Sequence, residues 1–127
     1  MKNVVLTIDD SKVILKINKK MLLELFPDCE VLSFLSPKEA IEGLEKLDCS
    51  INFALLDYNM EGMDGVELAQ KLVDNETCSI SYQKIAIVSA NIQPAVQEKA
   101  KGLGMDFIPK PLDQEKLEKF LKDRELL

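Results

Sequence analysis

The sequence predicts an α/β fold with one doubly wound parallel sheet, on three observations. Short apolar runs alternate five times with amphipathic segments along the 127 residues. The third run, residues 53–56 (FALL), is continuously apolar, which is typical of a parallel strand covered by helices on both faces. No linker, repeat or low-complexity tract interrupts this alternation. We therefore expect residues 1–127 to form one domain, with right-handed crossovers and helices on both faces of the sheet.

Residues 3–8 (NVVLTI) predict the first strand, which ends at Asp9 and Asp10. Ser11 can cap the helix that follows. Four lysines of this helix are most simply a solvated face, with docking of a partner as the alternative. The expected buried stripe is Ile14, Ile17, Met21, Leu22 and Leu25, and the lysines outside it are Lys12, Lys16, Lys19 and Lys20.

Residues 29–35 predict a second, weaker strand, and the next helix has a strong start signal. Ser36 suits the N-cap, Pro37 the first helical position, and Glu39 can complete a capping box. Residues 48–52 are expected to end this helix, and the expected buried stripe is Ala40, Ile41, Leu44 and Leu47.

After the central strand, Asp64 can cap a third helix with Glu67 at the box position. Val66, Ala69, Leu72 and Val73 form the apolar face of this helix. Residues 74–84 read as a polar connection, in which Cys78 and Tyr82 are assigned only to loop packing.

The C-terminal part repeats the pattern. Residues 85–89 (IAIVS) predict a fourth strand, and Pro94 lies in the first turn of a helix that Gly102 and Gly104 end. Residues 105–108 predict a short fifth strand before Pro109. The last helix is expected from about Asp113 to the C-terminus, with Leu117, Phe120 and Leu121 buried.

Composition excludes several classes of function. The net charge of -6 argues against attraction to nucleic acid or anionic lipid, and no apolar run reaches the length of a membrane span. Cys29, Cys49 and Cys78 have no CxxC spacing, so neither a disulfide framework nor a zinc site is indicated, and a reducing cytoplasm fits best. The chain has no histidine, which excludes Ser/His/Asp and Cys/His catalysis.

Polar residues collect where the predicted strands end. The strands end in Asp9-Asp10, in Asp57, in Ser89-Ala90 and in Lys110-Pro111, and the ends of parallel strands share one edge of a sheet. Carboxylates crowded there repel by about 4 kcal/mol per pair at close range. Lys110 and a hard cation such as Mg²⁺ would neutralise them.

This set of residues suits phosphoryl transfer. With the charges neutralised, one carboxylate can attack a phosphoryl group while the Ser89 hydroxyl bonds a phosphate oxygen. Taken singly, Asp9, Asp10 and Ser89 could be caps and Lys110 a solvated amine. Their joint placement at successive strand ends favours the functional interpretation.

The acidic pair Asp9-Asp10, the segment DYNMEGMDG from Asp57, Ser89-Ala90 and Lys110-Pro111 together resemble a CheY-like receiver domain of bacterial two-component response regulators, over essentially the whole chain. The resemblance implies a flavodoxin-like (βα)5 fold with strand order 2-1-3-4-5. It also implies that Asp57 is the phosphoacceptor.

The resemblance further assigns the remaining site residues. Asp10, Asp57 and the backbone carbonyl of Asn59 would bind Mg²⁺ directly, and Asp9 through water. Ser89 would bond the phosphate and Lys110 would pair with it, with a cis Lys110-Pro111 bond. Phe107 matches the aromatic switch position, although the sequence alone favours a half-buried strand aromatic there.

Partners also follow from the resemblance. A histidine kinase or phosphotransfer protein would donate the phosphoryl group after meeting the first helix. Phosphorylation would change a surface built by the fourth helix, fifth strand and fifth helix, which would bind a downstream protein or a linked output domain. We expect no nucleic acid contact by these residues, and a signalling domain that assists its own phosphorylation and dephosphorylation rather than an enzyme.

The chain departs from the family at Glu61, where proline is usual, and this adds a negative charge near the metal. Asn59 and Asn91 occupy positions that tune dephosphorylation in similar proteins. Glu61 favours one alternative, a binding module of the same fold that works without phosphorylation. A Mg²⁺-dependent phosphohydrolase is a second, although Asn59 stands where such enzymes often have an aspartate. A flavodoxin is weaker, because the first strand ends in Asp9-Asp10 rather than a glycine-rich loop.

Overall fold

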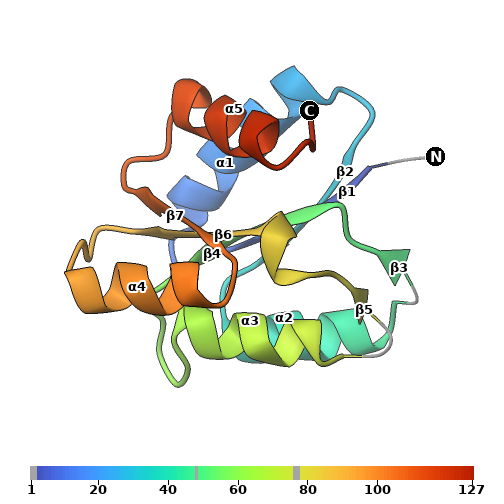
Figure 1. Ribbon diagram of the computed structural model, residues 1–127. Coiled ribbons are helices and arrows are strands. Elements are labelled where there is room, and N and C mark those ends of the chain that lie inside the picture. The colour runs from blue at the N-terminus through green and yellow to red at the C-terminus, as the bar shows by residue number, and fades with distance from the viewer. Residues whose placement is uncertain (1–2, 48, 76–77) are drawn as a thin grey trace.

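The computed structural model describes residues 3–47, 49–75 and 78–127, with Cys49 and Cys78 described by their backbone alone. A five-stranded parallel sheet forms the centre of the molecule, in the order β2-β1-β4-β6-β7 (Figure 1). When only the strands of this sheet are counted, this is the predicted order 2-1-3-4-5. The strands are β1 (Val4–Ile8), β2 (Glu30–Phe34), β4 (Phe53–Asp57), β6 (Ile85–Ser89) and β7 (Asp106–Pro109).

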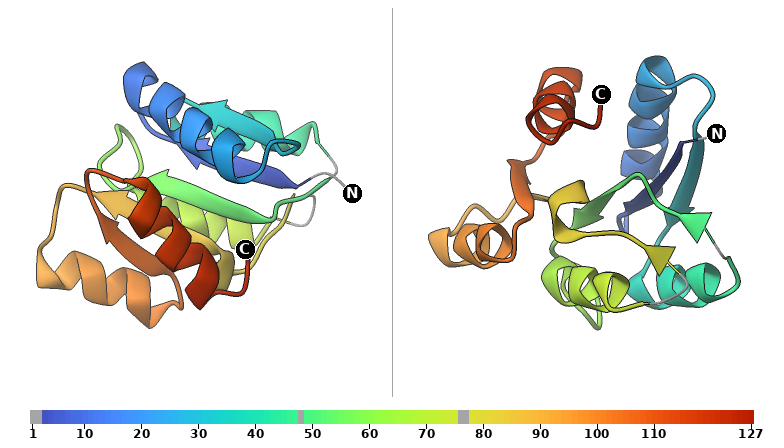
Figure 2. Two further views of the ribbon diagram at one scale, coloured as in Figure 1. Left: turned by 90° about the horizontal axis from the view of Figure 1, so that it is seen from above. Right: turned by 45° about the vertical axis from the view of Figure 1, so that its right-hand side comes forward.

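Helices cover both faces of the sheet, so the doubly wound fold is confirmed (Figures 1 and 2). One face carries α1 (Lys12–Leu25) and α5 (Gln114–Asp123). The opposite face carries α2 (Pro37–Glu45), α3 (Gly65–Val73) and α4 (Pro94–Gly102). None of the helices among the described residues is long and apolar enough to cross a membrane.

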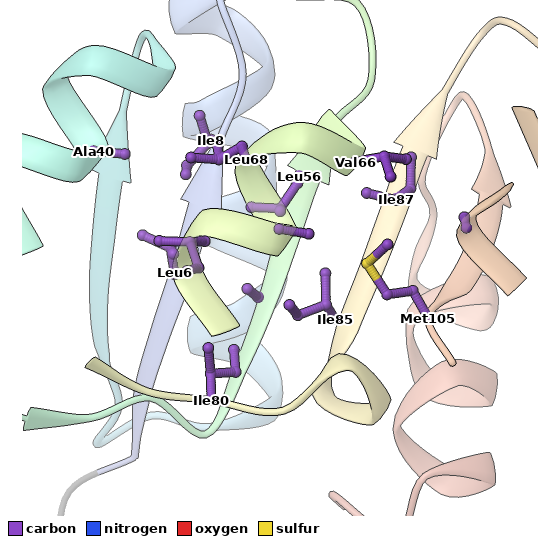
Figure 3. Close-up of a cluster of buried hydrophobic side chains, with 14 of the residues drawn as sticks. Leu6, Ile8, Ala40, Leu56, Val66, Leu68, Ile80, Ile85, Ile87 and Met105 are labelled. Carbon is purple, nitrogen blue, oxygen red and sulfur yellow. The ribbon is translucent and has the colours of Figure 1, made fainter. Parts of the chain in front are cut away.

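Each face of the sheet has its own buried cluster. Between the sheet and α2, α3 and α4, strand side chains such as Leu6, Leu56 and Ile87 pack against Val66 and Leu68 (Figure 3). Beneath α1 and α5, the Phe53 ring lies between Phe26 and Phe120, with ring centroids 5.9 and 6.3 Å away. All five residues of β4 and all five of β6 are buried, as the continuous apolar runs predicted.

Four of the predicted helix starts are confirmed by side-chain caps, which satisfy backbone N–H groups that have no partner within the helix, whereas α4 starts at Pro94 without a side-chain cap. Glu39 departs from the predicted capping box, because its carboxylate accepts from the Leu35 N–H at 3.2 Å rather than from the N–H of the cap residue. The capping oxygens accept from the N–H three residues ahead: Ser11 from Ile14, Ser36 from Glu39, Asp64 from Glu67, and Asp113 from Lys116.

Two residues expected in buried stripes are exposed. Ile17 is 47% exposed, because α1 instead buries Leu15, Asn18 and Leu22 against the sheet. Leu47 is 38% exposed, because α2 ends at Glu45 and Leu47 is no longer on the helix.

The connections predicted at residues 48–52 and 74–84 contain short elements of their own. Strands β3 (Cys49–Ser50) and β5 (Cys78–Ser79) form a separate parallel sheet, with Cys49 opposite Cys78, and a 3-10 turn, η1, follows at Tyr82–Lys84. Two-residue strands are too short to show a period, so the sequence could not indicate them. Residues 48, 76 and 77 of these connections lie outside the described residues.

Candidate functional site

The parallel register brings the polar strand ends to one edge of the sheet. Ile8 is level with Leu56, so Asp9 follows β1 at the height where Asp57 ends β4. On the other side, Ser89 is level with Pro109, so Lys110 leaves β7 beside the end of β6. The edge predicted from the sequence is therefore formed.

Three carboxylates meet at this edge. Asp9 and Asp57 are 3% and 5% exposed, whereas Asp10 is exposed. One ligand atom from each of the three lies within 4.8 Å of the other two. Hard divalent cations prefer such a set of carboxylate oxygens with an open, solvated side, so the residues present fit Mg²⁺.

Lys110 supplies the positive charge within the cluster. Its Nζ donates to Asp9 Oδ2 at 3.0 Å and lies 3.2 Å from Asp57 Oδ1. The other oxygen of Asp9 accepts from the Ser11 N–H at 3.0 Å. One lysine thus bridges two buried carboxylates that would otherwise repel each other.

Burial and neighbouring charges shift the pKa of both Asp57 and Lys110. Burial is the main cause that raises the pKa of Asp57 above its ordinary value, and repulsion from Asp9 adds to it, while Lys110 acts in the opposite direction. Burial alone would lower the pKa of Lys110, but its contacts with Asp9 and Asp57 outweigh burial, so this pKa is raised. Three carboxylates face one lysine here, so the formal charge of the cluster is negative.

Ser89 is fully buried, and among the described residues its hydroxyl has one hydrogen bond, in which it is the acceptor. Its Oγ accepts from the Asn91 N–H at 3.0 Å, and Asn91 Oδ1 accepts in turn from the Gln93 N–H at 3.1 Å. Because Oγ acts as an acceptor in the first bond, the Ser89 O–H remains a donor for an anionic ligand. The Ser89 carbonyl also accepts from the Lys110 N–H at 2.9 Å, which joins the two strand ends.

The other predicted residues lie in different positions. Asn59 and Glu61 are exposed in the loop after β4, and Glu61 forms no ion pair with the described residues. Phe107 is buried, at 7% exposure, and is not the half-buried aromatic that the sequence alone favoured. The Lys110-Pro111 bond is cis, as expected.

Gly65 also belongs to the site, although its place at the end of the segment DYNMEGMDG did not by itself predict a role for it. A Cβ there would collide with the Asp57 carbonyl oxygen and lie 3.1 Å from the Tyr58 Cα. The Gly65 N–H donates to the Tyr58 carbonyl at 2.9 Å, which folds the start of α3 back onto the end of β4. The signal in the sequence was a glycine directly after the Asp64 cap, where a side chain would be the ordinary choice.

Comparisons with known proteins agree on one family. The family model described as "Response regulator receiver domain" matches residues 5–122. The transcriptional regulatory protein FlgR of Helicobacter pylori is 36% identical over 106 residues, and the two-component response regulator ARR7 of Arabidopsis thaliana is 29% identical over 120 residues. These matches cover 80% and 85% of this chain, but the chain spans only 25% of FlgR and 55% of ARR7.

Solved structures show the same fold. The chemotaxis response regulator CheY4 of Vibrio cholerae superposes with a TM-score of 0.77 at 23% identity, covering 98% of this chain and 99% of that one. A CheY-like receiver domain protein of Methanospirillum hungatei gives a TM-score of 0.77 at 25% identity, covering 98% of both chains.

Proposed function

We propose a function for this chain from its family, because the chain belongs to the response regulator receiver domains. The proposal is that it accepts a phosphoryl group on Asp57 in a two-component phosphorelay. Members of this family are signalling domains that receive phosphoryl groups from histidine kinases or phosphotransfer proteins and pass the signal to output partners. The observation that carries the proposal is the 3.2 Å approach of Lys110 Nζ to the buried Asp57 carboxylate, within a cluster of two further carboxylates.

The chemistry follows from the charges at this site. An Asp57 carboxylate oxygen forms a bond to phosphorus while the P–N bond to the donor imidazole breaks, and the electron pair of that bond stays on the imidazole nitrogen. These 127 residues contain no histidine, so they cannot supply their own histidine donor. Lys110 and the Ser89 hydroxyl then bind oxygens of the transferred group.

Asp9, Asp10, Asp57 and the backbone carbonyl of Asn59 are the proposed ligands of Mg²⁺. When bound, the ion supplies positive charge that offsets the carboxylates and the phosphoryl oxygens. The formal charges support this assignment, because Lys110 alone faces three carboxylates.

The donor is proposed to dock over α1 and the loop after β7. A hollow of about 280 Å³ opens beside Lys110, and the α1 residues Val13 and Ile17 next to it are 65% and 47% exposed. Apolar residues exposed beside a reactive site are a common feature of docking surfaces. The residues that line the hollow are Ile14, Ile17, Asn18, Val88, Lys110, Pro111 and Leu112.

The output surface is proposed to be the face of α4, β7 and α5. Ser89 would move toward the phosphoryl group, and Phe107 on the adjacent strand would change position with it, which shifts the balance between inactive and active forms. A groove on this face is lined in part by Lys101, Phe107, Lys116 and Lys119, so a downstream protein or a linked output domain would meet a basic surface.

We also propose that the protein acts in the reducing cytoplasm, in keeping with the free thiol of Cys29.

Intact mass after incubation with acetyl phosphate tests the proposal, in wild type and in Asp57→Asn, with Mg²⁺ or with a chelator. We expect wild type to gain the mass of one phosphoryl group only when Mg²⁺ is present, and the variant to gain none. The Asp57→Asn change keeps the size of the side chain and removes the nucleophilic charge, so it is the matched control.

Two other outcomes would contradict the proposal in different ways. A folded wild type that never gains mass with any phosphodonor would favour the binding module that works without phosphorylation, to which Glu61 points. Continuous turnover of the donor without an accumulated adduct would favour the phosphohydrolase.

A further inference from the structure

A second lysine holds the backbone on both sides of Lys110. Lys116, in the first turns of α5, donates from Nζ to the Pro109 carbonyl at 3.2 Å and to the Pro111 carbonyl at 2.9 Å. These carbonyls belong to the residues immediately before and after Lys110. The backbone N–H of Lys116 is itself fixed by the Asp113 cap at 2.8 Å, so the lysine starts from a well-defined place on the helix.

The contact of Lys116 with the Pro109 carbonyl holds one end of a peptide unit whose other end is held by β6. The Pro109 carbonyl and the Lys110 N–H belong to the same planar group. The N–H end of this group donates to the Ser89 carbonyl at 2.9 Å, and the carbonyl end accepts from Lys116. The group is therefore held from β6 on one side and from α5 on the other, which fixes the direction in which the Lys110 side chain leaves the chain.

We propose that Lys116 is a positioning residue for Lys110 in the phosphoryl-accepting reaction, a role that rests on the function proposed above. The Lys110 side chain is long and flexible, so the placement of Nζ between Asp9 and Asp57 depends on where its backbone is held. Lys116 touches neither carboxylate and acts only through the loop. Because it also lines the groove over β7, the same side chain links the proposed output surface to the site lysine.

The chain offers matched variants for the test. Lys116→Met keeps the length of the side chain and removes the donors, and Lys116→Arg restores donors that can reach both carbonyls. Lys71→Met is the control, because Lys71 is exposed on α3, lies outside both proposed binding surfaces and forms no ion pair with the described residues. Each variant is compared with wild type for the rate of phosphorylation by acetyl phosphate at saturating Mg²⁺, for its Mg²⁺ affinity and for the fraction folded.

We expect Lys116→Met to accept the phosphoryl group about three- to tenfold more slowly per folded molecule, since a displaced catalytic group loses rate steeply with distance. Its Mg²⁺ affinity should equal that of wild type, because Lys116 contacts no proposed metal ligand. Lys116→Arg should recover most of the rate, and Lys71→Met should match wild type.

Equal rates for Lys116→Met and wild type would overturn the positioning role and leave the proposed function intact. A slower rate that Lys71→Met shares, or that comes with weaker Mg²⁺ binding or is not recovered by Lys116→Arg, would also overturn it. A folded wild type that takes up no phosphoryl group would overturn both proposals, so the two failures are distinguishable.

Discussion

Asp57 is a buried carboxylate whose surroundings favour its protonated form. It is 5% exposed, and burial and the neighbouring Asp9 outweigh the attraction of Lys110, so its pKa is raised. In the unfolded chain this carboxylate is solvated and has its ordinary pKa of 3.8. The ionised side chain therefore makes folding less favourable at neutral pH.

Replacing Asp57 by Asn should increase the free energy of unfolding at pH 7 by about 1 kcal/mol when no divalent cation is present. The folded state binds the Asp57 proton more tightly than the unfolded state does, so this residue lowers the stability of wild type as pH rises from 3.8 through the raised pKa. The advantage of the variant should therefore shrink as pH falls toward 3.8. Urea unfolding at several pH values, with a chelator present, measures it.

The exposed Glu98, on α4, gives the control for this measurement. Glu98→Gln should change the unfolding free energy by less than about 0.5 kcal/mol at every pH. An Asp57→Asn variant that is less stable than wild type at pH 7 would mean that the attraction of Lys110 exceeds the effects of burial and of Asp9.

The backbones of β4 and α3 approach each other very closely at the site. Gly65 begins α3 directly against the carbonyl of Asp57, the residue that ends β4. A side chain has no room there, so this glycine is required by a close approach of two backbone segments.

Gly65→Ala should destabilise the protein by about 3 kcal/mol, because the added Cβ forces the backbone of α3 away from Asp57. It should also slow phosphoryl uptake on Asp57, because the end of β4 moves with it. Gly102→Ala is the matched control, since its Cβ would meet no atom within 4 Å at the end of α4. That change should be neutral or stabilise the protein by up to about 1 kcal/mol. Thermal unfolding compares the two, and equal stabilities would show that the β4–α3 join is looser than described.

Some of the helices and strands could be predicted from the sequence and others could not. The continuous apolar runs of β4 and β6 and the capping residues Ser36 and Asp64 are local signals, and the elements they predicted are present. Ile17 was placed wrongly, because a period near 3.6 does not say which of two adjacent apolar rows of α1 faces the sheet. Strands β3 and β5 depend on a contact between distant segments, which no local pattern carries.

The site was predictable for a similar reason, and only in part. Strand ends must share an edge in a parallel sheet, so the proximity of Asp9, Asp57 and Lys110 followed from the predicted order. The bonds of Lys116 to two main-chain carbonyls could not be foreseen, because they depend on how the loop after β7 turns toward α5. The close approach at Gly65 likewise depends on the angle between a strand and a helix.

For the molecule as a whole, the net charge of -6 and the carboxylate cluster connect folding to cation binding. A cation that binds only the folded protein increases the free energy of unfolding in proportion to the logarithm of its concentration. Saturation with Mg²⁺, at about a hundredfold above its dissociation constant, should therefore stabilise wild type by about 2.7 kcal/mol.

Asp10→Asn should remove most of this gain in stability while changing the metal-free protein little, because Asp10 is exposed and forms no ion pair with the described residues. Urea unfolding with and without Mg²⁺ measures the gain in each protein. Glu98→Gln should keep the full gain, and an Asp10→Asn variant that also keeps it would place the ion away from the strand ends.

The hydrogen bond between Lys110 and Asp9 joins residues 101 positions apart, so it can form only after most of this chain has been synthesised. Every pairing in the central sheet is parallel, so each strand must wait for a crossover segment before it can add to its neighbour. Of the five strands of the central sheet, β7 is synthesised last, and Lys110 follows it in the sequence. A chain still in synthesis, or one that has lost β7 by proteolysis, has acidic strand ends without their lysine, so under the proposed function it would accept a phosphoryl group only after β7 has joined the sheet.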